Sequence, residues 1–102
     1  MESKQISEAL IDIIAKEPKI TGRRLAGMLK TNEQEIRAII NDLRSKGMPI
    51  ISEGKGYFIS YNEKHILNQI ISLQGRATKI FDAVLGLEKT LSIIQMRQPD
   101  ET

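Results

Sequence analysis

The 102 residues are enough for one domain. The 40% hydrophobic and 27% charged residues are typical of a soluble globular protein, and the lack of cysteine excludes disulfides, thiolate metal sites and a cysteine nucleophile. No apolar run approaches the roughly 18 residues of a membrane span, and the N-terminus lacks the layout of a signal peptide, so we expect a cytoplasmic protein without a membrane partner.

The net charge of +2 is small, but the positive charge is concentrated in one segment. Between Lys19 and Lys55, eight basic residues stand against four acidic ones, whereas from Glu63 onward there are five of each sign. A surface that faces nucleic-acid phosphates requires such an excess. A mixed, solvated surface is the alternative explanation.

Two helices are predicted in the first 30 residues. The first has Ser3 as its N-cap and ends before Pro18, because the residue before a proline is disfavoured in the α region. Its apolar face consists of Ile6, Leu10, Ile13 and Ile14. The second has Thr21 as its N-cap. Its apolar face consists of Leu25, Met28 and Leu29.

A third helix is expected directly after a turn at Lys30 and Thr31. Thr31 and Gln34 have the spacing of a capping box, and Gly47 suits the left-handed residue that ends a helix. The inward face consists of Ile36, Ile39, Ile40 and Leu43. These helices form a helix-turn-helix unit, although the same apolar spacing serves any packing of three helices.

Two β-prone runs, 48–52 and 57–61, flank a turn at 53–56 that carries two glycines. This pattern is typical of a hairpin, and Pro49 suits the start of an edge strand. A hairpin directly after the third helix is a wing. We therefore predict a mainly α fold with a small β-hairpin wing, a winged helix-turn-helix domain over residues 1–62.

The run 43–51 and the tip Gly54-Lys55-Gly56-Tyr57 resemble the winged helix of the biotin-repressor N-terminal family. In that family a lysine-glycine-tyrosine wing follows a Leu-Arg-rich helix and a glycine. The resemblance covers about Ile6 to Ser60, and the whole layout is also similar to small winged-helix proteins encoded by phages and prophages. It implies DNA binding in which the wing takes part. The biotin-ligase part of that family is missing, so no biotin chemistry carries over.

From Lys64 to Met96, apolar residues recur at alternating spacings of four and three, as in the a/d seam of a coiled coil. At about 1.5 Å per residue this helix spans roughly 50 Å, longer than the winged domain covers. We therefore predict a long coiled-coil-like oligomerisation helix over residues 63–97 that pairs with a second copy, and a flexible tail over 98–102. The seam consists of Ile66, Ile70, Leu73, Ala77, Ile80, Val84, Leu87, Leu91 and Ile94.

Two alternatives stay open for this segment. Apolar residues at e (Leu67, Phe81) and b (Ile71, Leu85) widen the stripe, so either the helix also packs on its own winged domain or more than two helices assemble. A break at Gly75 would instead fold the segment into a helical hairpin. The unbroken rhythm of the seam favours one helix.

Opposite its apolar face, the third helix presents Gln34, Arg37 and Asn41, with Arg44 to one side. Gln and Asn can bond adenine and Arg can bond guanine, so this face is able to read a major groove. Candidate phosphate contacts are Arg23, Arg24, Lys30 and Lys55. Each of these residues also suits an ordinary solvated surface, and the acidic Glu33, Glu35 and Asp42 argue against phosphates nearby.

Catalysis has little support in the sequence. His65 is the only histidine, has no second ligand nearby in the chain, and is expected to cap a helix or lie on the surface. No paired carboxylates and no Gly-rich loop between a strand and a helix are found. We expect a non-enzyme without a metal or cofactor.

The leading hypothesis is a dimeric, sequence-selective DNA-binding protein in transcription regulation or phage DNA replication. Its partners would be double-stranded DNA and further copies of itself. The alternative is a protein-interaction adaptor, a phage-encoded inhibitor or loader of a host complex, that uses the winged helix without binding DNA. In that case the partner is a host protein.

Overall fold

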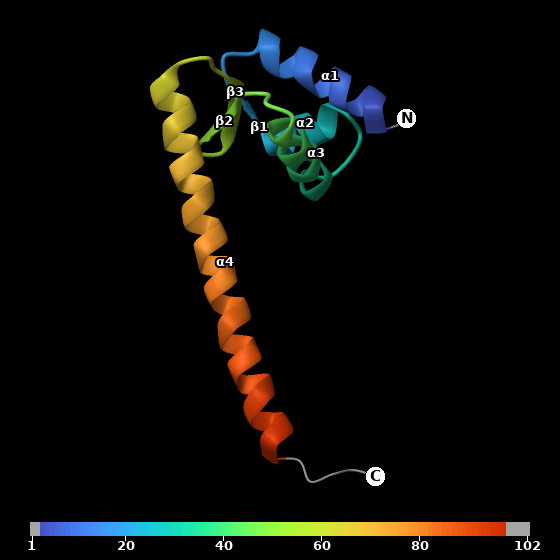
Figure 1. Ribbon diagram of the computed structural model, residues 1–102. Helices are drawn as coiled ribbons and strands as arrows, with labels where there is room; N and C mark the ends of the chain where they lie inside the picture. The colour runs from blue at the N-terminus through green and yellow to red at the C-terminus, as the bar shows by residue number, and fades with distance from the viewer. Residues whose placement is uncertain (1–2, 98–102) are drawn as a thin grey trace. The chain divides into compact units, whose positions relative to one another are not determined.

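The structure is a computed structural model that describes residues 3–97 (Figure 1). Its contacts divide the chain into two compact units, Met1–Gln69 and Ile70–Thr102. The first, called the winged unit here, holds every strand and the first part of the last helix. The elements in chain order are α1 (Ser3–Lys16), β1 (Ile20–Thr21), α2 (Gly22–Met28), α3 (Glu33–Ser45), β2 (Ile50–Glu53), β3 (Gly56–Ile59) and α4 (Glu63–Arg97). The mainly α fold with a hairpin wing and a long last helix is as predicted.

Helix α1 ends at Lys16, before Pro18 as predicted. Ser3, predicted as the N-cap, is the first described residue and already lies within the helix, so that prediction is wrong. The helix contributes Ile6, Leu10 and Ile14 to the core, and Ile13 packs against that core while partly exposed. The spacing of four residues explains why these side chains meet on one face.

Helix α2 has the predicted N-cap: the Thr21 hydroxyl accepts a hydrogen bond from the backbone N–H of Arg24 at 3.1 Å. Met28, predicted to face the core, is 50% exposed. At about 100° per residue, Leu25, Ala26 and Leu29 share one side of this short helix, and Met28 lies well to the side of it. Ala26, not Met28, completes the buried face.

The turn between α2 and α3 corrects a second prediction. The N-cap of α3 is Asn32, whose side-chain oxygen accepts from the backbone N–H of Glu35 at 2.9 Å. Thr31 is committed to closing α2, because its own N–H donates to the Ala26 carbonyl at 2.9 Å. Lys30 precedes it with a left-handed φ of 55°, the conformation that this closing turn requires. The capping role therefore falls one residue later than the Thr31–Gln34 spacing predicted.

Helix α3 ends as predicted. Gly47 has a φ of 96°, its N–H donates to the Arg44 carbonyl at 2.9 Å, and the next N–H, of Met48, donates to the Leu43 carbonyl at 3.0 Å. This pair of bonds is the Schellman motif, which needs a left-handed residue between the two donors. The buried residues of α3 are those predicted, Ile36, Ile39, Ile40 and Leu43.

The wing belongs to a three-stranded antiparallel sheet with the order β1-β3-β2. Strand β1, which was not predicted, pairs with β3 through Ile20 and Tyr57. Strands β2 and β3 are joined by a two-residue loop, Gly54 and Lys55, in which Gly54 has a φ of 63°. Strand β2 is an edge strand, and Pro49 precedes it as expected. The core beneath the sheet includes Ile20 and Ile50, both almost fully buried.

Helix α4 begins after Asn62, whose side-chain oxygen accepts from the N–H of Lys64 at 2.9 Å. It runs without a break through Gly75 and Gly86 (Figure 1), so the helical hairpin considered above is not formed. No helix within residues 3–97 is long and apolar enough to cross a membrane. The predicted flexible tail, 98–102, lies outside the described residues.

Candidate nucleic-acid interface

The outward face of α3 carries the three predicted base-reading residues. The exposed residues are Gln34, Arg37 and Asn41. On the opposite, inward face of the helix, Ile36 and Ile40 are buried. Since residues four apart lie on the same side of a helix, Arg37 and Asn41 continue one line of side chains that starts at Glu33. The helix thus presents a row of hydrogen-bonding groups to solvent.

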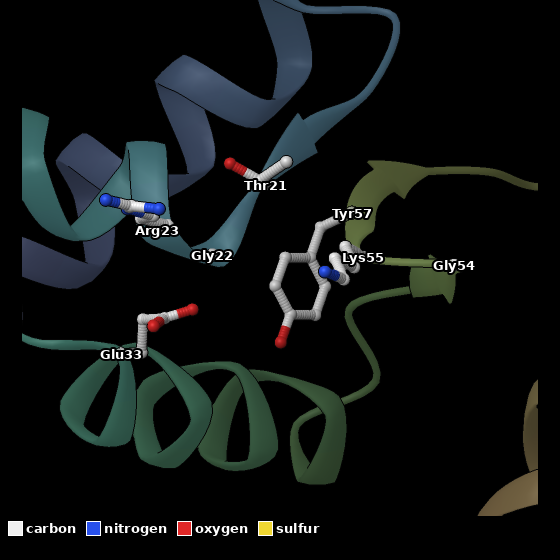
Figure 2. Close-up of a pocket in the computed structure, with 7 residues that line it drawn as sticks. All are labelled: Thr21, Gly22, Arg23, Glu33, Gly54, Lys55 and Tyr57. Carbon is white, nitrogen blue, oxygen red and sulfur yellow. The ribbon is translucent and has the colours of Figure 1, made fainter.

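A hollow joins the start of this row to the wing. It is lined by Thr21, Gly22 and Arg23 from β1 and α2, by Glu33 from α3, and by Gly54, Lys55 and Tyr57 from the wing. Figure 2 shows the Tyr57 ring between the start of α2 and the wing tip, with Lys55 beside it and Glu33 across from it. Three chain segments that are far apart in sequence therefore meet at the first turn of α3.

Gly22 allows this close arrangement. A Cβ at position 22 would lie 3.2 Å from Cε2 of Tyr57 and 3.7 Å from Oε1 of Glu33. Because 3.2 Å is tighter than an ordinary carbon–carbon contact of about 3.5–4.0 Å, any larger residue would push the Tyr57 ring away. Neither Gly22 nor Tyr57 was a predicted site residue, since their proximity depends on the pairing of β1 with β3.

Two of the three acidic residues of α3 are engaged locally. Glu35 accepts a hydrogen bond from the Thr31 hydroxyl at 2.8 Å, and Asp42 pairs with Lys46 one turn later at 2.9 Å. The Glu33 side chain forms no hydrogen bond or ion pair with any residue in 3–97. Its exposed carboxylate is the one that bears on the electrostatics of the hollow, where Arg23 and Lys55 supply the positive charge.

The candidate phosphate contacts differ in their surroundings. Arg23, Lys30 and Lys55 are exposed and form no ion pair with a residue in the described part of the chain. Arg24 pairs with Glu17 at 3.4 Å, but its side chain stays 60% exposed, so the pair contributes little to stability. Arg23 and Lys55 share the hollow, whereas Lys30 lies at the far end of α2.

Arg44, predicted to contact DNA, is engaged in the fold. Its Nε donates to the Ile50 carbonyl at 2.8 Å, and a terminal nitrogen donates to the Ser52 hydroxyl at 3.2 Å. The side chain thus joins the last turn of α3 to strand β2. Ser52 in turn donates its backbone N–H to the side-chain oxygen of Gln69 at 2.7 Å. No sequence signal distinguishes Ser52 and Gln69 from ordinary surface positions.

The remaining polar contacts near the wing are structural. The Ser60 hydroxyl and His65 Nδ1 lie 2.7 Å apart, and the His65 ring packs edge-on against Phe58. Lys19 pairs with Glu53 at 3.2 Å, and its aliphatic stem crosses Gly56. Within residues 3–97 no cluster of three or more metal-ligating side chains is present.

The predicted oligomerisation residues form an apolar stripe along α4. Six of them, Ile70, Ile80, Val84, Leu87, Leu91 and Ile94, are between 41% and 71% exposed. Ala77 is also exposed, whereas Ile66 and Leu73 are partly buried. So many exposed Leu, Ile and Val side chains on one helix are unusual for an isolated chain.

Comparison with known protein families matches residues 4–58 to the family described as HTH domain. The match runs from α1 into β3 and covers more than half of the chain. It includes α2, the turn, α3 and the wing tip, which are the segments that form the interface described above. Comparisons with curated proteins and with solved structures give no match.

Proposed function

Because the chain belongs to the helix-turn-helix (HTH) domain family, we propose that its winged unit binds double-stranded DNA in a sequence-selective manner. Helix α3 enters the major groove, where Gln34, Arg37 and Asn41 contact base edges. Lys55 on the wing and Arg23 on α2 contact the flanking phosphates. The winged unit is of the biotin-repressor type, and its setting is the cytoplasm, in transcription regulation or phage DNA replication.

The observation that carries this proposal is the convergence of the wing tip and α2 on the first turn of α3. Arg23 and Lys55 line the same hollow as Glu33, and the exposed row of α3 begins at that residue. A duplex that receives α3 in one groove would therefore bring its backbone to both cations. Arg44 is left out of the proposed contacts because its guanidinium is held by β2.

Self-association through α4 completes the proposal. Burying a Leu or Ile side chain contributes roughly 1.5–3 kcal/mol, so pairing of the seam in two copies is strongly favoured over leaving it in water. Paired winged units would select a palindromic or repeated DNA site. The variant Leu73→Glu with Leu87→Glu is expected to abolish pairing, as measured by light scattering.

The DNA-binding proposal is tested by duplex affinity as a function of salt. The affinity should fall steeply with salt, and Lys55→Ala should lower the slope of log K against log salt by about one, since one phosphate contact is lost. Arg37→Ala should weaken binding to the recognised DNA site more than binding to a random duplex. Lys4→Ala, which replaces an exposed lysine on α1, is the matched control and should change neither the salt slope nor this preference.

Lack of duplex binding even near 50 mM salt would exclude the proposal, as would unchanged binding in both Arg37→Ala and Lys55→Ala.

A second candidate function, a protein-interaction adaptor of a host complex, is favoured by the free carboxylate of Glu33 at the start of α3. It predicts a stoichiometric complex with a partner protein that survives nuclease treatment. Glu33→Gln would then weaken binding to that partner, whereas it would not weaken binding to DNA.

A further inference from the structure

We propose that α4 assembles as a bundle of four copies of this chain, through two separate apolar stripes on each helix. This rests on the self-association proposed above and adds how many copies meet and through which residues. The seam stripe consists of the a and d residues from Ile66 to Ile94. The side stripe consists of the e and b residues Leu67, Ile71, Phe81 and Leu85.

The angle between the two stripes fits four helices. Each side-stripe residue directly follows a seam residue: Leu67 follows Ile66, and Leu85 follows Val84. One residue turns a helix by about 100°, so the two stripes face directions about 100° apart. In a square bundle the two neighbours of a helix lie about 90° apart, compared with about 60° in a three-stranded arrangement. A two-stranded coil would leave the side stripe in water.

The side stripe is exposed in the single chain. Its four residues are between 48% and 60% exposed. Two positions of the same e/b pattern, Gln74 and Thr78, are polar. The Thr78 hydroxyl donates to the Gln74 carbonyl at 2.9 Å, so its hydrogen bond is satisfied within the helix and its methyl group is compatible with an apolar contact. Only Gln74 interrupts the stripe between Leu67 and Leu85.

The residue types of the seam are mixed. Leu at a with Ile at d favours more than two strands, and the last pair of the seam is Leu91 at a with Ile94 at d. Ile70 with Leu73 and Val84 with Leu87 are instead of the two-stranded type. Four copies are therefore indicated by the side stripe and not by the seam.

Two different stripes, each paired with its own kind on a neighbouring copy, generate a closed tetramer with two-fold axes. Beyond Leu85 the e and b positions are the polar Glu88 and Ser92, so the second contact is limited to the part of α4 nearer the winged unit. Four copies carry two pairs of winged units. Such an assembly is able to hold two duplex sites at once.

The test is the mass of the full chain by light scattering. Wild-type protein should give four times the chain mass of 11.5 kDa. Phe81→Glu with Leu85→Glu should halve that mass while leaving the helical circular dichroism unchanged. Lys79→Glu with Lys89→Glu, which lies outside both stripes, is the matched control and should remain at four copies. Phe81→Gln with Leu85→Gln repeats the test without adding charge, should the first variant aggregate.

The outcomes separate this inference from the proposed function. A wild-type mass of two or three copies overturns the four-copy bundle and leaves self-association and DNA binding intact. A wild-type mass of one copy overturns self-association as well. If wild-type protein holds four copies but the Phe81 and Leu85 variants do too, the side stripe is not the second contact and the inference fails.

Discussion

Ser52 donates two hydrogen bonds to the side-chain oxygen of Gln69, from its backbone N–H at 2.7 Å and from its hydroxyl at 3.2 Å. Gln69 is 8% exposed and is the one buried polar side chain among the described residues. The Ser52 hydroxyl also accepts from Arg44. Helix α3, strand β2 and the start of α4 are therefore joined by one chain of polar contacts, which connects the helix proposed to contact base edges to the helix proposed to bring copies together.

Replacing Gln69 is expected to destabilise the winged unit. Gln69→Ala leaves the Ser52 N–H without its acceptor in a partly buried place, which costs about 1–3 kcal/mol of unfolding free energy. Urea denaturation at one fixed protein concentration measures this, because self-association makes stability depend on concentration. Lys89→Ala, at an exposed position of the same helix outside both stripes, is the control and should change stability by less than about 0.5 kcal/mol. Equal stabilities of the two variants would show that the Ser52–Gln69 contact contributes nothing.

The N-cap of α3 gives a second prediction. Asn32→Ala removes the acceptor for the Glu35 N–H and should lower the unfolding free energy by about 1 kcal/mol. Asn32→Asp keeps an acceptor and should retain most of the stability. Thr31→Val removes only an exposed hydroxyl contact to Glu35 and should cost less than Asn32→Ala. Thermal unfolding of the three variants, compared at the same concentration, checks the order. A larger loss of stability in Thr31→Val than in Asn32→Ala would show that Thr31, and not Asn32, is the N-cap.

Most of the fold follows from local patterns in the sequence. The apolar spacing of Leu10 and Ile14, of Ile36 and Ile40, and of the whole seam predicted helices because residues three or four apart lie on one face of a helix. Gly47 was found because glycine, which has no Cβ, adopts the left-handed conformation at a helix end more readily than other residues. These features depend on residues within a few positions of each other, and the structure confirms them.

Apart from the cap of α3, the features that were missed depend on residues distant in the sequence. The two residues of β1 form a strand only because β3 lies beside them, and no two-residue run carries a strand signal of its own. Thr31 has good capping chemistry, but its N–H is already used to close α2. Gln69 falls at a g position of the heptad, where a polar residue is ordinary, so its burial against β2 cannot be predicted from the pattern. The hollow likewise forms only because Gly22 and Tyr57, which are far apart in the sequence, lie in close contact.

Helices α2 and α3 both end in a left-handed residue, so removing a glycine at one end and introducing one at the other should change stability in opposite directions. Gly47→Ala places a Cβ at a φ of 96° and should destabilise by about 1–2 kcal/mol. Lys30 occupies the equivalent position after α2 with a φ of 55°, so Lys30→Gly relieves a left-handed conformation and should be neutral or stabilising. Chemical denaturation of both variants checks the signs. Loss of stability in Lys30→Gly comparable to that in Gly47→Ala would mean that the Lys30 side chain stabilises the turn by contacts of its own.

Gly56 and Gly75 form the last pair, since the same substitution should act in opposite directions. A Cβ at Gly56 would overlap the Lys19 stem that crosses β3, so Gly56→Ala must displace Lys19 and loosen its contact with Glu53. We expect a loss of about 1–3 kcal/mol, as for other overpacked positions. Nothing lies within 4 Å of a Cβ at Gly75, in the middle of α4, so Gly75→Ala should stabilise that helix by about 0.5–1 kcal/mol. Thermal unfolding followed by circular dichroism measures both, and Lys19→Ala in the Gly56→Ala background should recover part of the loss by removing the overlapping stem.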